Sequence, residues 1–129
     1  MPRQRPPLAD QELEVMQVVW DQGEVTVREV YEAFRARRSI AYTTVLTTMR
    51  ILEQKGHLGV SRAARAHVYR ARSTREGVLR AMVRHFVDRV FGGAAEPLVQ
   101  HLIRDKRLSA DDLREIASRL NGPDKGDDG

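Results

Sequence analysis

The stretch IAYTTVLTTMRILEQKG, residues Ile40–Gly56, decides how the rest of the chain is interpreted. Val45, Met49 and Leu52 recur at the i, i+4, i+7 spacing of one helix face, so the stretch is predicted to form an amphipathic helix. Gly56 stands where a left-handed residue commonly ends a helix. The apolar stripe is expected to face a core. The opposite side of the helix would then be exposed to solvent and available for binding.

The opposite side of this helix is rich in threonine. Threonine is β-branched and lowers helix propensity, so a helix that only had to be soluble would favour Glu or Lys there. A short side chain with both a methyl and a hydroxyl group suits a base edge in the major groove of DNA. Taken alone, the pattern fits a chance run of surface threonines equally well. The residues on this side are Thr43, Thr44, Thr47, Thr48 and Arg50.

Two helices are predicted before this stretch. Residues 8–22 and 27–36 both carry apolar side chains at helical spacing. Thr26 and Glu29 have the spacing of a capping box at the start of the second helix.

A β-hairpin is predicted after the stretch. Apolar and small residues alternate over residues 58–61, a second short strand is predicted at residues 67–70, and a small basic turn at residues 62–66 lies between them. Three helices followed by a basic hairpin is the order of a winged helix-turn-helix domain. In that architecture the third helix enters the major groove, and the hairpin, called the wing, reaches the neighbouring backbone.

Charge is distributed unevenly along the 129 residues, whose net charge is +4. Residues 1–72 carry 12 Lys or Arg and 8 Asp or Glu, whereas residues 73–129 carry ten of each. Between Arg35 and Arg72 there are nine basic residues and only Glu53 is acidic. This distribution indicates a polyanion-binding module joined to a neutral part with a different task.

The neutral part is predicted to consist of three helices. Ser73 and Glu76 have capping-box spacing before the first, Pro97 fits the first turn of the second, and Ser109 with Asp112 would cap the third. The fold class is therefore mainly α with a small β-hairpin wing. We expect a winged-helix DNA-binding domain at residues 1–72, a helical dimerisation domain at residues 73–121 and a disordered tail at residues 122–129.

The apolar band of these three helices is too broad for them to bury alone, and exposed apolar surface is costly at roughly 25 cal/mol per Å². The expected partner is the same segment of a second chain, and a two-fold homodimer would read an inverted-repeat site. Packing of the helices against the DNA-binding part of a monomer is the alternative. The expected dimerisation residues are Val78, Leu79, Met82, Val83, Phe86, Val87, Val90, Phe91, Leu98, Leu102, Leu113, Ile116 and Leu120.

Several classes of protein are disfavoured. The chain has no cysteine, which excludes disulfides and thiolate metal sites, and it has neither a signal-like apolar start nor a membrane-spanning run. Its four histidines fall on different predicted elements, without a nucleophile and base at a recognisable spacing. We expect a cytoplasmic, nucleoid-associated protein that is not an enzyme and has no cofactor, metal or membrane partner.

The sequence resembles the penicillinase-repressor family of bacterial transcription regulators, the BlaI/MecI/CopY type. The resemblance rests on LADQELEVMQVVWD (residues 8–21), TVREVYEAF (26–34), AYTTVLTTMRILEQKGHL (41–58) and RAHVYRA (65–71). It extends more loosely to FGG at residues 91–93 and to LSADDLREI at residues 108–116.

The resemblance implies a dimeric repressor that binds double-stranded operator DNA with TACA/TGTA-like half-sites. It also implies an upstream sensor-protease pathway that ends in cleavage within the C-terminal domain. The corresponding candidate proteolytic site is His101–Leu102, where the family has an Asn-Phe step, and this departure counts against cleavage induced by β-lactams. The copper-responsive branch carries cysteine pairs that this chain lacks, which argues against copper sensing by that route.

The mechanism we expect is steric repression at an operator that overlaps a promoter. Two alternatives remain: a sensor that binds an effector or metal in its C-terminal helices, and a winged helix that binds RNA or another protein. The expected DNA-binding residues are Arg35, Arg37, Arg38, Tyr42, Thr43, Thr44, Thr47, Thr48, Arg50, Arg62, Arg65 and His67.

Overall fold

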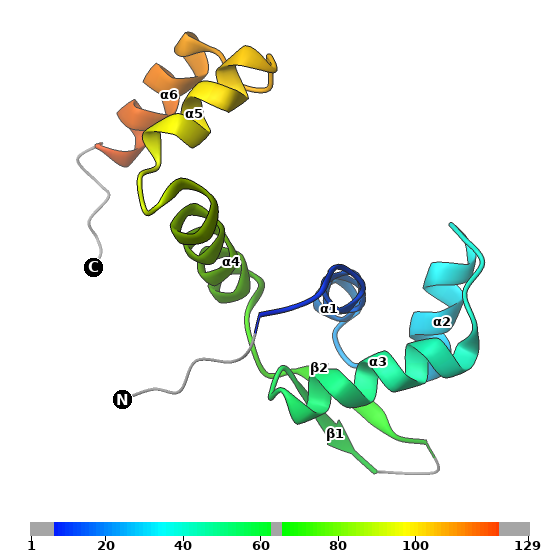
Figure 1. Ribbon diagram of the computed structural model, residues 1–129. Coiled ribbons are helices and arrows are strands. Elements are labelled where there is room, and N and C mark those ends of the chain that lie inside the picture. The colour runs from blue at the N-terminus through cyan, green and yellow to red at the C-terminus, as the bar shows by residue number, and fades with distance from the viewer. Residues whose placement is uncertain (1–6, 63–65, 122–129) are drawn as a thin grey trace, which may run out of the picture. The chain divides into compact units, whose positions relative to one another are not determined.

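The computed structural model describes residues 7–62 and 66–121. The chain divides into two compact units, Met1–Met82 and Val83–Gly129. The elements are labelled in Figure 1, and their order is α1 (Asp10–Gln22), α2 (Val27–Arg35), α3 (Tyr42–Gln54), β1 (Leu58–Ser61), β2 (Val68–Ala71), α4 (Arg75–Phe91), α5 (Glu96–Arg104) and α6 (Ala110–Leu120).

The first unit has the predicted order of three helices and a hairpin. Strands β1 and β2 pair antiparallel, from Leu58 opposite Ala71 to Ser61 opposite Val68. Val25, in the link between α1 and α2, forms a further bridge to Tyr69. This bridge ties the hairpin to the link between the first two helices.

The core of the first unit is built from the apolar stripe of α3. Val45, Met49 and Leu52 are fully buried, as their spacing predicts. They pack with side chains from the other helices and the hairpin, and complete burial of one such side chain stabilises the fold by about 1.5–3 kcal/mol. The other members of this cluster are Val15, Met16, Val18, Val19, Val25, Val27, Val30, Phe34, Leu58 and Tyr69.

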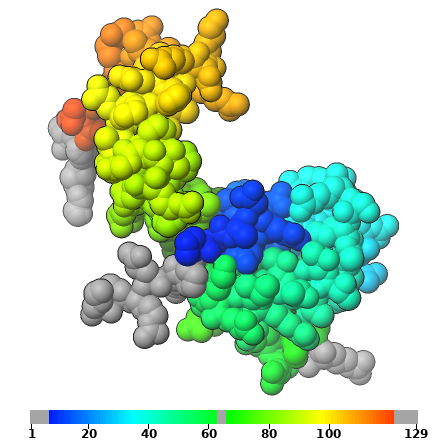
Figure 2. Space-filling model, in the orientation of Figure 1, coloured from blue at the N-terminus to red at the C-terminus, as the bar shows by residue number. Residues whose placement is uncertain are grey.

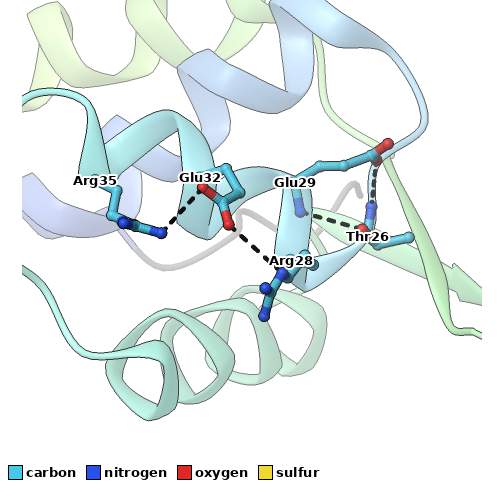
Figure 3. Close-up of polar contacts among 5 residues, drawn as sticks. All are labelled: Thr26, Arg28, Glu29, Glu32 and Arg35. Carbon is cyan, nitrogen blue, oxygen red and sulfur yellow. Dashed lines mark hydrogen bonds and ion pairs between the residues drawn. The ribbon is translucent and has the colours of Figure 1, made fainter.

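The helix boundaries follow from capping interactions. At α2 the predicted box is present, because Glu29 N donates to Thr26 Oγ1 (3.1 Å) and Thr26 N donates to Glu29 Oε1 (2.9 Å) (Figure 3). Helix α3 ends before Gly56, whose φ of 88° favours glycine.

The predicted capping box of Ser73 and Glu76 at the start of α4 is wrong. Gly77 N donates instead to the hydroxyl of Thr74, at 3.0 Å. The reason is that the Ser73 hydroxyl lies 2.8 Å from Nδ1 of the buried His57 and is engaged there.

The second unit contains the rest of α4 together with α5 and α6. Pro97 lies in the first turn of α5, and the capping box of Ser109 and Asp112 begins α6, both as predicted. Among the described residues of this unit, 83–121, only Val87 is buried. The large apolar side chains with at least a third of their surface exposed here are Val83, Phe86, Val90, Ile103, Ile116 and Leu120.

Two of the expected dimerisation residues are already buried in the single chain. Val78 and Val87 are only 6% and 9% exposed in the single chain, so they have little surface left for a partner. The tail predicted at residues 122–129 lies outside the described residues.

Within the described residues no helix is long and apolar enough to cross a membrane.

Candidate nucleic-acid interface

The exposed face of α3 carries most of the side chains predicted to contact bases. Tyr42, Thr43, Thr44, Thr47 and Arg50 are all exposed. The opposite stripe of the helix is fully buried, which fixes the rotation of α3 about its axis. The helix therefore presents hydroxyl, methyl and guanidinium groups to solvent in one fixed orientation.

The assignment of Thr48 to this face is wrong. Thr48 is only 8% exposed, and its hydroxyl donates to the backbone carbonyl of Thr44 at 2.8 Å. A buried hydroxyl needs such a partner, and the carbonyl one turn earlier supplies it. Thr48 is a core residue that happens to be adjacent to the exposed Thr47.

An aromatic contact joins α2 to the start of α3. The rings of Tyr31 and Tyr42 meet edge to face, with centroids 5.5 Å apart. The guanidinium of Arg35 lies over the Tyr31 ring, 5.8 Å from its centroid. Figure 2 shows α2 and α3 adjacent on one continuous surface of the first unit. Arg35 therefore belongs to the surface that includes the start of α3.

A carboxylate lies between two arginines on the exposed side of α2. Glu32 is within 3.5 Å of both Arg28 Nε and Arg35 Nη1 (Figure 3). All three side chains are about half exposed or more, so these ion pairs are easily exchanged for contacts with another anion.

The other two arginines at the end of α2 turn toward α1. Arg38 pairs with Glu14 of α1 at 2.8 Å, and the guanidinium groups of Arg37 and Arg38 both lie near the Phe34 ring. A phosphate contact by Arg38 must compete with Glu14. The environment of Arg35 therefore differs from that of Arg37 and Arg38.

The wing supplies the remaining predicted contacts. Arg62, directly after β1, and His67, directly before β2, are exposed at the end of the hairpin. Arg70 of β2 lies 4.0 Å from Glu24, a distance at which the two charges attract only weakly. The predicted contact Arg65 lies outside the described residues.

A partly buried ion pair anchors the C-terminal end of α3. Lys55 Nζ donates to Glu12 Oε1 of α1 at 2.7 Å and to the Pro7 carbonyl at 3.1 Å. The backbone N–H of Ala9 also donates to Glu12. Burial alone would raise the pKa of Glu12, but these hydrogen bonds and the charges of Lys55 and His57 outweigh it and hold that pKa below its usual value.

Sequence reasoning missed two residues on this surface. Gln54 is exposed four residues after Arg50 and seven after Thr47, so it extends the same stripe of α3, and an amide can pair with adenine. Arg28 lies seven residues, or about two helical turns, before Arg35 on α2. Both residues share helical spacing with predicted contacts, but neither lies within a cluster of like residues in the sequence.

Among the described residues there is no group of three or more His, Asp or Glu side chains that could hold a metal ion. The candidate proteolytic site, His101–Leu102, lies within α5. The ring of His101 lies near that of Phe91 at the end of α4, with their centroids 5.9 Å apart.

The fold and this surface define a winged-helix DNA-binding protein. The family model described as penicillinase repressor matches residues 8–122, which is most of the chain. The chain belongs to the penicillinase repressor family, whose members are transcriptional repressors and not enzymes.

Individual relatives agree with this placement. The transcriptional regulator BlaI of Mycobacterium tuberculosis is 36% identical over 109 residues, covering 70% of this chain and 79% of the relative. The penicillinase repressor of Bacillus licheniformis is 24% identical over 111 residues, covering 86% and 87%. The solution structure of the DNA-binding domain of the repressor BlaI matches with a TM-score of 0.51 and 27% identity, over 57% of this chain and 90% of that one. The predicted winged-helix fold is confirmed.

Proposed function

We propose that the protein is a dimeric repressor of transcription that binds inverted-repeat operators in double-stranded DNA. The observation that carries the proposal is the exposed face of α3, where Thr43, Thr47 and Arg50 follow each other at helical spacing above a fully buried stripe. In a winged helix this is the position of the recognition helix.

Base reading is assigned to α3, and backbone contacts to its surroundings. The threonine hydroxyl and methyl groups can contact base edges, and Arg50 suits guanine or a phosphate. Arg28, Arg35 and Arg62 would neutralise phosphates on either side of the groove. Arg37 and Arg38 are assigned smaller contributions because they lie toward α1.

Homodimerisation through the second unit is supported by its poor internal burial. Only Val87 is buried among its described residues, whereas Val83, Phe86 and Val90 of α4 expose about half of their surface. Three short helices with so small a core gain little stability by themselves, and a second copy would cover the exposed apolar side chains. A two-fold axis through this contact would present two α3 helices to two half-sites.

The family resemblance suggests half-sites of the TACA/TGTA type, and a bound dimer would exclude polymerase from an overlapping promoter. The protein would act in the cytoplasm, at the nucleoid. If a sensor-protease pathway ends at His101–Leu102, α5 must first unfold locally, because the bond lies inside a helix.

The test is fluorescence anisotropy with a labelled TACA/TGTA inverted repeat and a scrambled duplex of equal length, each at two salt concentrations. Preferential binding to the repeat, saturating at two chains per duplex, is the expected result. Equal and strongly salt-dependent binding to both duplexes would contradict sequence-specific recognition. Saturation at one chain per duplex would contradict the dimer.

A further inference from the structure

Ile51 is a large apolar side chain on the exposed side of α3. It keeps 36% of its surface exposed, whereas Met49 and Leu52 of the same helix are fully buried. It is not a member of the buried cluster that forms the core of the first unit. A single exposed isoleucine is common on protein surfaces, so the neighbours of Ile51 on α3 decide what this side chain can do.

The neighbours of Ile51 are side chains of the face assigned to base reading. Thr44 and Thr47 lie seven and four residues before it, and Gln54 lies three residues after it. Residues at these spacings stand above one another on a helix surface, so the four side chains form one row. All four are exposed. Ile51 is therefore the purely apolar member of a row that otherwise carries hydroxyl and amide groups.

The last turn of α3, which carries Ile51 and Gln54, is held in place by the rest of the first unit. The backbone N–H of Lys55 donates to the Ile51 carbonyl at 2.9 Å, so the helix is still intact at this point. Leu52 is fully buried, and the Lys55 ammonium group donates to Glu12 of α1 at 2.7 Å. These contacts fix the directions in which the Cα–Cβ bonds of Ile51 and Gln54 point.

The two side chains suit different groups on the base edges of the major groove. Isoleucine has no side-chain hydrogen-bond donor or acceptor, and the one methyl group on a base edge is the C5 methyl of thymine. Contact of Ile51 with a phosphate or with a polar base edge would remove water without a compensating hydrogen bond. The amide of Gln54 both donates and accepts, which matches N7 and the N6 amino group of adenine.

We propose that Ile51 and Gln54 are specificity-determining residues, with Ile51 packed against a thymine methyl group and Gln54 paired with an adenine. The inference rests on the proposed function, because it requires α3 to lie in the major groove. Side chains three residues apart on a helix have Cβ atoms about 5–6 Å apart. The two residues should therefore contact the same A·T pair of a half-site or two neighbouring ones.

The experiment removes single groups from the TACA/TGTA inverted repeat and measures Kd by fluorescence anisotropy. Thymines are replaced one at a time by deoxyuridine, which lacks the methyl group, and adenines by 7-deazaadenine, which lacks the N7 acceptor. For the wild-type chain, deoxyuridine at one position should weaken binding about fourfold, the effect of one buried methyl-sized group. 7-Deazaadenine at one position should weaken binding about fivefold, the effect of one hydrogen bond.

Variants identify which side chain reads which group. Ile51→Ala should abolish the deoxyuridine penalty and keep the 7-deazaadenine penalty, and Gln54→Ala should do the reverse. Ile51→Val keeps a branched apolar side chain and should keep most of the deoxyuridine penalty. A general loss of stability would weaken binding to modified and unmodified duplexes equally, so it would leave both penalties unchanged.

Ile103→Ala is the matched control. Ile103 of α5 is exposed to nearly the same extent as Ile51, at 38%, but it belongs to the second unit. Both penalties of this variant should equal those of the wild type.

A wild-type chain that prefers the repeat to the scrambled duplex but tolerates deoxyuridine at every thymine would overturn the assignment of Ile51 and leave the repressor function intact. An Ile51→Ala variant that keeps the full deoxyuridine penalty would do the same. Persistence of the 7-deazaadenine penalty in Gln54→Ala, or its absence in the wild type, would overturn the assignment of Gln54. A wild-type chain that does not recognise the inverted repeat would overturn the proposed function and this inference with it.

Discussion

Thr47 and Thr48 are adjacent in the chain and identical in chemistry, yet they lie in different environments. Thr47 is exposed beside Arg50, whereas Thr48 is buried with its hydroxyl bonded to the Thr44 carbonyl. Successive helix positions are separated by about 100°, which is enough to cross the boundary between core and surface. The pair therefore provides a variant and its control within one helix turn.

Thr47→Ala should reduce the discrimination between operator and scrambled DNA by about tenfold, because one contact to a base edge is lost. Thr48→Ala should leave that discrimination unchanged, because this side chain faces the core. Paired anisotropy titrations of the two variants on both duplexes check this expectation. Unaltered discrimination in Thr47→Ala would show that the reading face of α3 is assigned wrongly.

Glu12 is a second residue with a defined physical role. Its pKa is lowered in the folded chain, so its contribution to the free energy of unfolding is present above the unfolded value and is lost as pH falls through the folded value. Glu12→Gln should destabilise the first unit by about 1.5–3 kcal/mol at pH 7, the range for hydrogen bonds to a charged group.

Urea unfolding at several pH values measures this effect. The difference between wild type and Glu12→Gln should shrink below about pH 4.3, where the unfolded carboxyl group becomes protonated, and vanish in stronger acid. Glu14→Gln, which loses only the half-exposed pair with Arg38, should cost less. A difference for Glu12→Gln that stays constant down to pH 2 would contradict the assigned ion pair.

At the scale of elements, α2 contributes a charged side next to the start of α3. Glu32 lies between Arg28 and Arg35, and the ring contact of Tyr31 with Tyr42 joins this side to α3. When DNA binds, the Glu32 carboxylate would repel the phosphates. It would also pair with Arg28 and Arg35, the two arginines that attract those phosphates.

Glu32→Gln should therefore tighten binding to both the operator and the scrambled duplex, by about threefold to tenfold at low salt. The ratio of the two Kd values should change little. Glu115→Gln in α6 removes the same charge from an exposed position in the other unit and serves as the control. The readout is the salt dependence of Kd for the two variants. Equal affinity of Glu32→Gln and wild type would place this side of α2 away from the DNA.

At the scale of the whole molecule, the two units differ in how much they bury. The first has a cluster of thirteen core residues drawn from three helices, the link between α1 and α2, and the hairpin, whereas the described part of the second has only Val87. Folding stability scales with buried apolar surface, so the two units should behave differently when separated.

A fragment of residues 1–82 should fold cooperatively and sediment as a monomer, and it should bind the inverted repeat far more weakly than the full chain. It should also melt at a higher temperature than residues 1–72, because it retains Val78 and the Arg75–Asp21 pair. Calorimetry and sedimentation of the two fragments check these points. Dimerisation of residues 1–82 would contradict the assignment of self-association to the second unit.

Residues whose roles are local could be predicted from the sequence alone. Capping boxes at Thr26 and Ser109, the buried stripe of α3 and the alternation of the hairpin all depend on spacing within one element. The winged-helix order follows from these elements in sequence. That is why the fold class and most of the exposed threonine face were predicted correctly.

Other properties depended on which element packs against which. Only the tertiary structure placed Thr48 in the core, directed Arg38 to Glu14 of α1 and engaged the Ser73 hydroxyl with His57 instead of capping α4. Each of these contacts joins residues far apart in the chain or depends on how far the core extends around a helix. Spacing within an element carries no information about such partners, because they are determined when the elements pack together.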